Sequence, residues 1–139
     1  MLDHVSLGTS DIARAAHFYD AAMAALGFVR VWTMAEAVGY GPPGADDKLA
    51  IKLRSGFVVP GPGFHLALTA QTREEVDAFF EAALASGGAA NGEPGLRPNY
   101  GPGYYAAFVF DPDGHALEAV CHEQSSVREG RGSEFPSPK

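Results

Sequence analysis

Two histidines and one glutamate stand where they could do metal chemistry. His4 and His65 each open a short apolar segment, and Glu118 lies within the apolar stretch HALEAV. A buried charge is costly unless something compensates it, so this carboxylate calls for a partner. Imidazole and carboxylate groups together suit divalent first-row metals, and three protein ligands leave positions open for substrate or water. The residue types therefore predict a catalytic site with Fe, Mn, Ni or Zn.

An internal repeat relates the two histidines to each other. The segment DHVSLGTSDIARAAHFYDAAMAALGF aligns without a gap with FHLALTAQTREEVDAFFEAALASGGA, which places His4 over His65. The last strand predicted in each half extends the relation, because LAIKLR laid over HALEAV places Lys52 over Glu118. Self-similarity of this kind predicts two copies of one structural unit.

Each half is predicted to form a strand, a helix and three further strands. Short apolar segments bounded by polar residues indicate the strands, and apolar residues at helical spacing indicate the helices. Ser10 or Asp11 is expected to cap the first helix, and Thr72-Arg-Glu-Glu75 has the form of a capping box at the second. The predicted strands are Leu2–Gly8, Val29–Thr33, Ala37–Tyr40 and Leu49–Arg54, then Phe64–Thr69, Ala89–Gly92, Tyr104–Phe110 and His115–His122.

The repeat divides the chain into one domain of two modules. We expect module one to span 1–56, a linker rich in glycine and proline to span 57–63, and module two to span 64–123. The remaining residues, 124–139, are polar and rich in serine, glycine and proline. Such a segment has little to bury, and we expect it to be a flexible tail.

Strand alternation predicts which faces carry the polar side chains. In LAIKLR the leucines and the isoleucine share one face and leave Lys52 on the other, and in HALEAV Leu117 opposes Glu118. The apolar faces are expected to pack under the two helices. The remaining faces are then expected to line one concave surface, which carries His4, Lys52, His65 and Glu118.

Lys52 has several alternative roles on such a surface. Its ammonium could neutralise an anionic substrate or a developing oxyanion beside the metal. A depressed pKa could make it a general base. It could also pair with Glu118 in place of a metal, which would make the protein a metal-free binding module, or it could reach solvent.

A glycine-rich loop in the second half supplies further candidates. Arg97, Tyr100, Tyr104 and Tyr105 cluster around it and are predicted to contact substrate if the loop folds over the pocket. The alternative is a loop packed by its own aromatic side chains.

Composition excludes several classes of partner. The formal charge of −7 and the pI near 5.1 argue against binding to nucleic acid or to an anionic membrane. No apolar run approaches the roughly 18 residues that a bilayer crossing needs, and no signal-peptide pattern opens the chain. We therefore expect a cytoplasmic protein that binds a small molecule.

Residues 1–123 resemble the glyoxalase/bleomycin-resistance/extradiol-dioxygenase group, also called the vicinal oxygen chelate superfamily. The segments that carry the resemblance are LDHVSLGTSDIARAAHFYDAAMAALGF, GFHLAL and FVFDPDGHALEAV. It implies an α+β fold of two pseudo-symmetric βαβββ modules, whose strands form an open, barrel-like sheet around a central metal. It also implies that His4, His65 and Glu118 are the metal ligands, and that the protein is a homodimer with sites often shared between subunits.

Lys52 departs from the pattern of glyoxalase I-like members, which carry a glutamate at the matching place. This difference argues against lactoylglutathione lyase activity. The resemblance instead favours dioxygenase-like or thiol-transfer-like chemistry on a small oxygen-rich substrate chelated to the metal, with Lys52 assisting by its charge. The alternative is a metal-free protein of the bleomycin-resistance type, which binds or sequesters a small molecule.

Overall fold

The computed structural model describes residues 1–122 and contains two successive βαβββ units. The tail expected at 124–139 lies outside the described residues. In chain order the elements are β1 (Val5–Thr9), α1 (Ile12–Ala25), β2 (Val29–Met34), β3 (Ala37–Gly41), β4 (Leu49–Leu53), β5 (Leu66–Thr69), α2 (Arg73–Ala85), β6 (Ala89–Leu96), a short 3₁₀ turn (Pro98–Tyr100), β7 (Tyr105–Phe110) and β8 (Ala116–Cys121).

Each unit forms its own four-stranded mixed sheet, with the strand orders β1-β4-β3-β2 and β5-β8-β7-β6. The first strand of each unit pairs parallel with the last, and the other pairs are antiparallel. The predicted α+β class with paired βαβββ units is confirmed, and both sheets remain open. Neither helix of the described chain has the length and apolar character that a membrane crossing requires.

The helices begin where the sequence predicts. Asp11 is the N-cap of α1 and accepts a hydrogen bond from the backbone N–H of Arg14 at 3.0 Å. Thr72 caps α2 by accepting from the N–H of Glu75 at 3.1 Å. The Glu75 carboxylate accepts in turn from the N–H of Gln71 at 2.8 Å, one residue earlier than a regular capping box would place it.

Strand β6 is longer than the sequence predicts. The expected strand ended at Gly92, but pairing with β7 continues to Leu96 through Pro94 and Gly95. The pairing includes two register shifts, one on each side of Gly92. An edge strand tolerates such bulges and a residue without an N–H. The second part of β6 can therefore be rich in glycine and proline, and such a composition does not show the pattern of a strand in the sequence.

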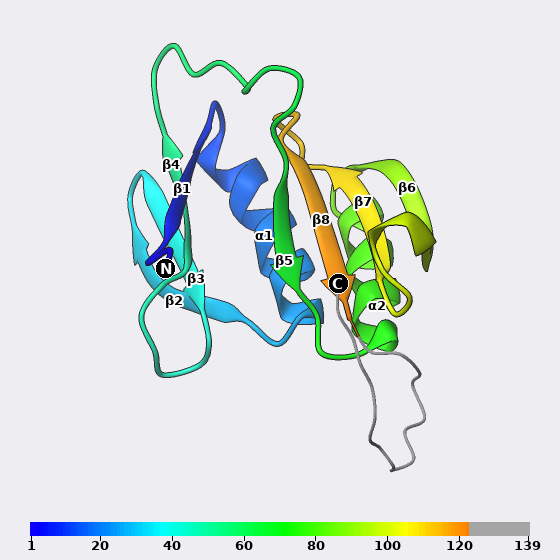
Figure 1. The fold of residues 1–139 in the computed structure, drawn as a ribbon. Coiled ribbons are helices and arrows are strands. Elements are labelled where there is room, and N and C mark those ends of the chain that lie inside the picture. The colour runs from blue at the N-terminus through cyan, green and yellow to red at the C-terminus, as the bar shows by residue number, and fades with distance from the viewer. Residues whose placement is uncertain (123–139) are drawn as a thin grey trace.

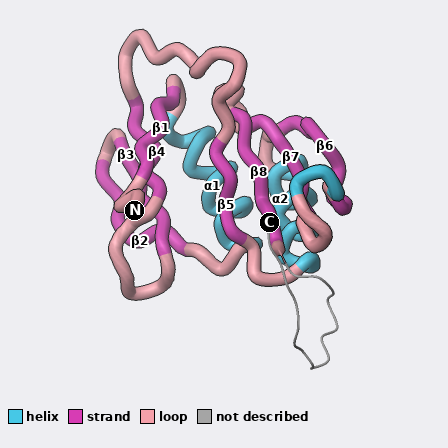
Figure 2. Tube along the Cα trace, in the orientation of Figure 1, coloured by secondary structure: helices cyan, strands magenta, loops and turns pink. Residues whose placement is uncertain are grey.

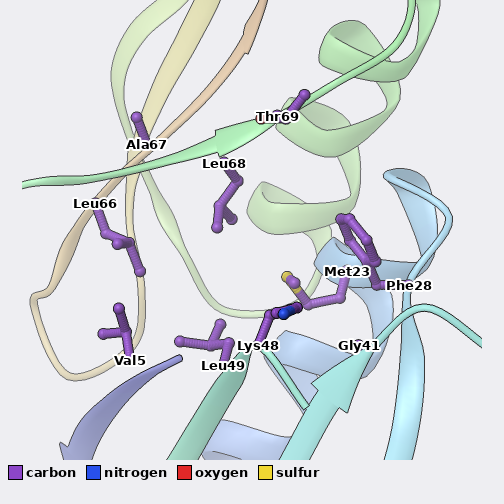
Figure 3. Close-up of a pocket in the computed structure, with 10 residues that line it drawn as sticks. All are labelled: Val5, Met23, Phe28, Gly41, Lys48, Leu49, Leu66, Ala67, Leu68 and Thr69. Atoms are coloured by element: carbon purple, nitrogen blue, oxygen red, sulfur yellow. The ribbon is translucent and has the colours of Figure 1, made fainter. Parts of the chain in front are cut away.

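The two helices pack against each other and share one core with both sheets (Figures 1 and 2). Phe18 of α1 and Phe79 of α2 are fully buried in this core. At its edge, helix-facing side chains of the first sheet, such as Leu49, line the same pocket as Leu66 and Leu68 of the second sheet (Figure 3). The helix-facing sides of the sheets are thus turned toward each other. Their opposite sides, called the outward sides below, are turned away.

The turn between β7 and β8 fastens the two units together at one end. The Asp113 carboxylate accepts hydrogen bonds from the backbone N–H of Ser10 at 3.2 Å, from the Ser10 hydroxyl at 3.0 Å, and from the Thr9 hydroxyl. The Arg14 guanidinium forms an ion pair with the same carboxylate at 2.6 Å. Burial alone would raise the pKa of Asp113, but these hydrogen bonds and the Arg14 charge hold it below its ordinary value.

Two further contacts join the same turn to the first unit. The Tyr19 hydroxyl of α1 donates to the buried Asp111 carboxylate at 2.5 Å. The Nε2 atom of His115 lies within hydrogen-bonding distance, 2.8 Å, of the Gly8 carbonyl oxygen at the end of β1. We refer to this set of contacts around the turn as the module clamp.

The internal repeat does not reproduce the module clamp at the other end of the junction. Gln71 and Glu75 occupy the places in the second unit that correspond to Ser10 and Arg14. A mostly apolar pocket of about 180 Å³ remains there, with Lys48 among the residues that line it (Figure 3). One end of the junction is therefore held by polar contacts, and the other is left open.

We expect Asp113→Ala to lower the free energy of unfolding by about 2–4 kcal/mol, because it leaves several donors without an acceptor. Chemical denaturation measures the change. The exposed Asp46 of the β3–β4 loop gives a matched control, and Asp46→Ala should change the value by less than about 0.5 kcal/mol. Equal and small effects of the two substitutions would show that the clamp does not stabilise the fold.

The lowered pKa of Asp113 also predicts a pH dependence. A carboxyl group whose pKa is depressed by folding stabilises the protein above its unfolded pKa, and this contribution is lost as the pH falls through the folded pKa. The difference in unfolding free energy between the unmodified protein and Asp113→Asn should therefore be constant near neutrality and shrink below about pH 4. Urea denaturation over a pH series measures it, and a difference that persists unchanged at pH 2 would contradict the assignment.

Candidate functional site

Glu118 lies on the outward side of the second sheet, and only 2% of its side chain is exposed. Its Oε1 atom lies 2.9 Å from Nε2 of His65. Its Oε2 atom accepts a hydrogen bond from the Tyr104 hydroxyl. Both oxygens of the buried carboxylate are therefore partnered by side chains from its own sheet.

Strand pairing explains why these groups meet. β5 runs parallel to β8 with Ala67 opposite Glu118, and His65 precedes Ala67 by two residues, on the same side of the sheet. On the other flank, β7 places Phe108 opposite Glu118. Tyr104 lies four residues before Phe108, so alternation turns it to the outward side as well.

Tyr104 holds the Glu118 carboxylate in place as a hydrogen-bond donor. Burial, the hydrogen bond to Glu118 and the charge of Glu118 raise the pKa of the Tyr104 hydroxyl well above its ordinary value. A phenol is protonated at neutral pH in any case, and the raised pKa extends its role as a hydrogen-bond donor to more alkaline pH. Its ring packs edge-on against the rings of Tyr100 and His122, with centroid separations of 5.2 and 5.1 Å.

His4 and Lys52 lie apart from this group. His4 precedes β1, has a half-exposed side chain, and places Nδ1 2.7 Å from the Asp3 carboxylate. Lys52 lies on the outward side of the first sheet, where it lines a shallow hollow with Trp32. Among the described residues, no ion pair joins Lys52 to Glu118.

The convergence of four side chains that the repeat predicts is therefore not found within one chain. The reason is the packing of the two units. The helix-facing sides of the sheets are turned toward each other, so the outward sides that carry Lys52 and Glu118 lie on opposite sides of the helix pair.

The residues present fit only part of a metal centre. Within residues 1–122, no three His, Cys, Asp or Glu side chains are placed to bind one metal. The pair of His65 Nε2 and Glu118 Oε1, 2.9 Å apart, does have the spacing of two adjacent ligands. Bonds of about 2.1 Å at right angles place two ligand atoms about 3.0 Å apart. A metal bound there needs its third protein ligand from elsewhere.

The predicted substrate contacts divide between the two sides of the second sheet. Arg97 lies over the Phe108 ring on the outward side, and the exposed Tyr100 packs on Tyr104. Tyr105 is instead turned toward α2, where its hydroxyl donates to Asp77 at 2.8 Å. Adjacent residues of a strand point to opposite sides, so Tyr104 and Tyr105 do not share a site.

Sequence reasoning missed one residue of this surface, Phe108, and had considered a second, His122. Phe108 lies opposite Glu118, with its ring centroid 6.3 Å from that of His65. The alternation of Tyr104, Ala106 and Phe108 along β7 could have identified it. His122 has the strand parity of Glu118, which predicts a place at the rim of the site or in solvent, and in the structure it is exposed and packs on Tyr104.

Known proteins share the sequence pattern and the fold. The family model described as Glyoxalase/Bleomycin resistance protein/Dioxygenase superfamily matches residues 1–119. A solved glyoxalase/bleomycin resistance protein from Albidiferax ferrireducens is 31% identical, with a TM-score of 0.73 over 85% of this chain and 95% of that chain. A glyoxalase-related enzyme from Fulvimarina pelagi is 25% identical, with a TM-score of 0.68 over 87% of each chain.

A more distant structure shares the fold alone. The E144Q mutant of glyoxalase I from Zea mays is 22% identical, with a TM-score of 0.64 over 86% of this chain and 46% of that chain. No match was found among curated proteins. The family match over nearly the whole described chain and the 31% identity to a solved member lead to one conclusion: this chain belongs to the glyoxalase/bleomycin resistance protein/dioxygenase superfamily.

Proposed function

We propose that this chain is a metalloenzyme acting on a small, oxygen-rich molecule, with a divalent metal held by His65 and Glu118 of one chain and His4 of a second copy. The observation that carries the proposal is the spacing of 2.9 Å between His65 Nε2 and Glu118 Oε1. Two imidazoles and one carboxylate suit Fe, Mn, Ni or Zn and leave positions open for substrate.

The second copy is proposed because of where the two outward sides lie. In a twofold-symmetric homodimer, the outward side of the first sheet in each chain can face that of the second sheet in its partner, and one operation forms two identical sites. Apolar side chains exposed on these sides support such contact. Met34 beside Lys52 is 67% exposed, and Tyr100 beside Tyr104 is 58% exposed.

Each chain's own residues then have distinct tasks. A metal bound by these residues would supply a Lewis acid to which adjacent oxygen atoms of the substrate could coordinate. Tyr104 orients Glu118 through its hydroxyl. Lys52, which shares an outward side with His4, adds a cation that stabilises an anionic substrate or a developing oxyanion. Neither Lys52 nor Ala50, which the strand pairing places at the position matching Glu118, can supply a fourth carboxylate ligand, so dioxygenase-like or thiol-transfer-like chemistry is favoured over lactoylglutathione lyase activity.

A metal-free protein that binds or sequesters a small molecule is the second candidate, and one observation favours it. Both oxygens of Glu118 already accept hydrogen bonds, from His65 and Tyr104, so the carboxylate is compensated without a metal. In this case the outward side of the second sheet binds a ligand and performs no reaction.

Metal content separates the two candidates. We expect protein purified without chelator to hold about one transition-metal ion per chain, as measured by elemental analysis. Glu118→Gln should weaken metal binding by at least about tenfold, because it removes a charged ligand, whereas Lys52→Ala should leave binding unchanged. Less than about a tenth of an equivalent, with no uptake of added Fe(II), Mn(II), Ni(II) or Zn(II), would favour the metal-free candidate.

A mixing experiment tests whether the site is shared between two chains. His4→Ala and Glu118→Gln should each bind metal poorly when pure. After subunit exchange, a mixed dimer combines the intact Glu118 of one variant with the intact His4 of the other at one of its two sites. An equimolar mixture should therefore regain about a quarter of the unmodified metal content.

The same mixture also tests the alternative arrangement, in which one chain supplies all three metal ligands. If all three ligands came from one chain, neither variant would complete the other and the metal content would stay at the level of the pure variants. His4→Ala mixed with itself under the same exchange conditions provides the control. Size-exclusion chromatography of the unmodified protein should also show a dimer, and a monomer at the working concentration would exclude the shared site.

A further inference from the structure

The guanidinium of Arg97 is fixed in place without being neutralised. Its Nη1 donates to the Gly95 carbonyl at 3.0 Å, and its Nη2 donates to the Glu93 carbonyl at 2.7 Å. Its Cζ atom lies 5.3 Å from the centre of the Phe108 ring, in a cation–π contact. Within the described part of the chain, no carboxylate forms an ion pair with it.

Two glycines of β6 provide the room for this arrangement. A Cβ atom at Gly95 would lie 3.2 Å from Nη1 of Arg97. A Cβ atom at Gly92 would lie 3.3 Å from Nη2 and 3.1 Å from the Phe108 ring, and Gly92 also has a φ of +151°. A side chain at either position would press on the guanidinium, so the glycine-rich strand acts as a cradle for Arg97.

Arg97 and the His65–Glu118 pair flank the same aromatic ring. The strand order β5-β8-β7-β6 places Phe108 of β7 between Glu118 of β8 and the Arg97 cradle on β6. Phe108 is partly buried, and its ring centroid lies 6.3 Å from that of the His65 ring. Across the strands of the second sheet, its outward side therefore presents the His65–Glu118 pair, then the aromatic ring of Phe108, then the cation of Arg97.

The net charge of the chain is relevant to the role of the Arg97 cation. The protein carries a formal net charge of −7, yet Arg97 has no acidic partner in the described structure. Two of its five N–H donors are used by backbone carbonyls, and the others remain for a ligand. A guanidinium in this state binds carboxylates strongly, because it offers parallel charge-assisted hydrogen bonds.

We propose that Arg97 is a specificity-determining residue that binds the acid group of an anionic substrate, a flat carboxylate whose body lies on Phe108 and whose opposite end reaches His65 and Glu118. This proposal deepens the proposed function. Only the reaction at the His65–Glu118 end of the substrate depends on the metalloenzyme proposed above. Recognition of the acid group requires the Arg97 cradle alone.

Benzoate and its neutral analogue benzamide test this directly, by ligand titration monitored with NMR. In the presence of EDTA, the unmodified protein should bind benzoate at least about tenfold more tightly than benzamide, as expected for one charge-assisted hydrogen-bonded pair. Arg97→Gln should abolish the preference, and Arg97→Lys should reduce it, because the charge remains while the two-point geometry is lost. Arg30→Gln is the matched control, since Arg30 pairs with the exposed Asp20 elsewhere, and should leave the preference unchanged.

Each contrary result overturns the assignment. Equal affinities for benzoate and benzamide in the unmodified protein would show that the protein has no such anion site, and this result requires no variant. A preference retained in Arg97→Gln would place the acid group elsewhere. A preference for benzoate that is seen only without EDTA, and that persists in Arg97→Gln, would show that a bound metal and not Arg97 binds the acid group. Because metal content is measured separately, failure of the metal proposal leaves the benzoate result unaffected.

Discussion

The packing of α1 against α2 is the constraint on which the rest of the molecule depends. It turns the apolar side of each sheet inward, where Phe18 and Phe79 are fully buried in one core. Strand alternation then leaves the polar residues of each sheet on its outward side. The two outward sides, one carrying Lys52 and the other Glu118, consequently lie on opposite sides of the helix pair.

The burial of Glu118 imposes the second condition on the site. A carboxylate with 2% exposure would destabilise the fold without partners, and His65 and Tyr104 supply one hydrogen bond to each oxygen. Each oxygen is thus held by a different side chain, so the carboxylate is kept in one orientation. The spacing that compensates the charge also equals the spacing of adjacent ligands on a metal. The same geometry therefore supports both candidate functions.

The two units share a fold but differ where chemistry is concentrated. The module clamp around Asp113 seals one end of their junction, while the corresponding end beside Lys48 is left as an apolar pocket. The outward sides differ in the same way. The alignment predicted from sequence placed Lys52 over Glu118, but the strand pairing is two residues different: Glu118 lies opposite Ala67 in the second unit, and Ala50 lies opposite the corresponding Ser6 in the first. The Arg97 cradle belongs to the second unit alone, because it depends on the irregular, glycine-rich β6. Loss of symmetry thus provides a stable junction and a chemically asymmetric surface from one repeated fold.

The sequence by itself determined the two βαβββ units, their helix caps and the side of the sheet on which Lys52 and Glu118 lie. Periodicity, capping and alternation are local properties, and alternation correctly placed Glu118 and Leu117 on opposite sides of one strand. The order of the strands and the packing of the helices are set by contacts between residues far apart in the chain. Only the tertiary structure therefore decided that Tyr104 bonds to Glu118, that Arg97 lies over Phe108, and that His4 is separated from both within one chain, because helix packing and not strand alternation fixes how the two sheets face each other.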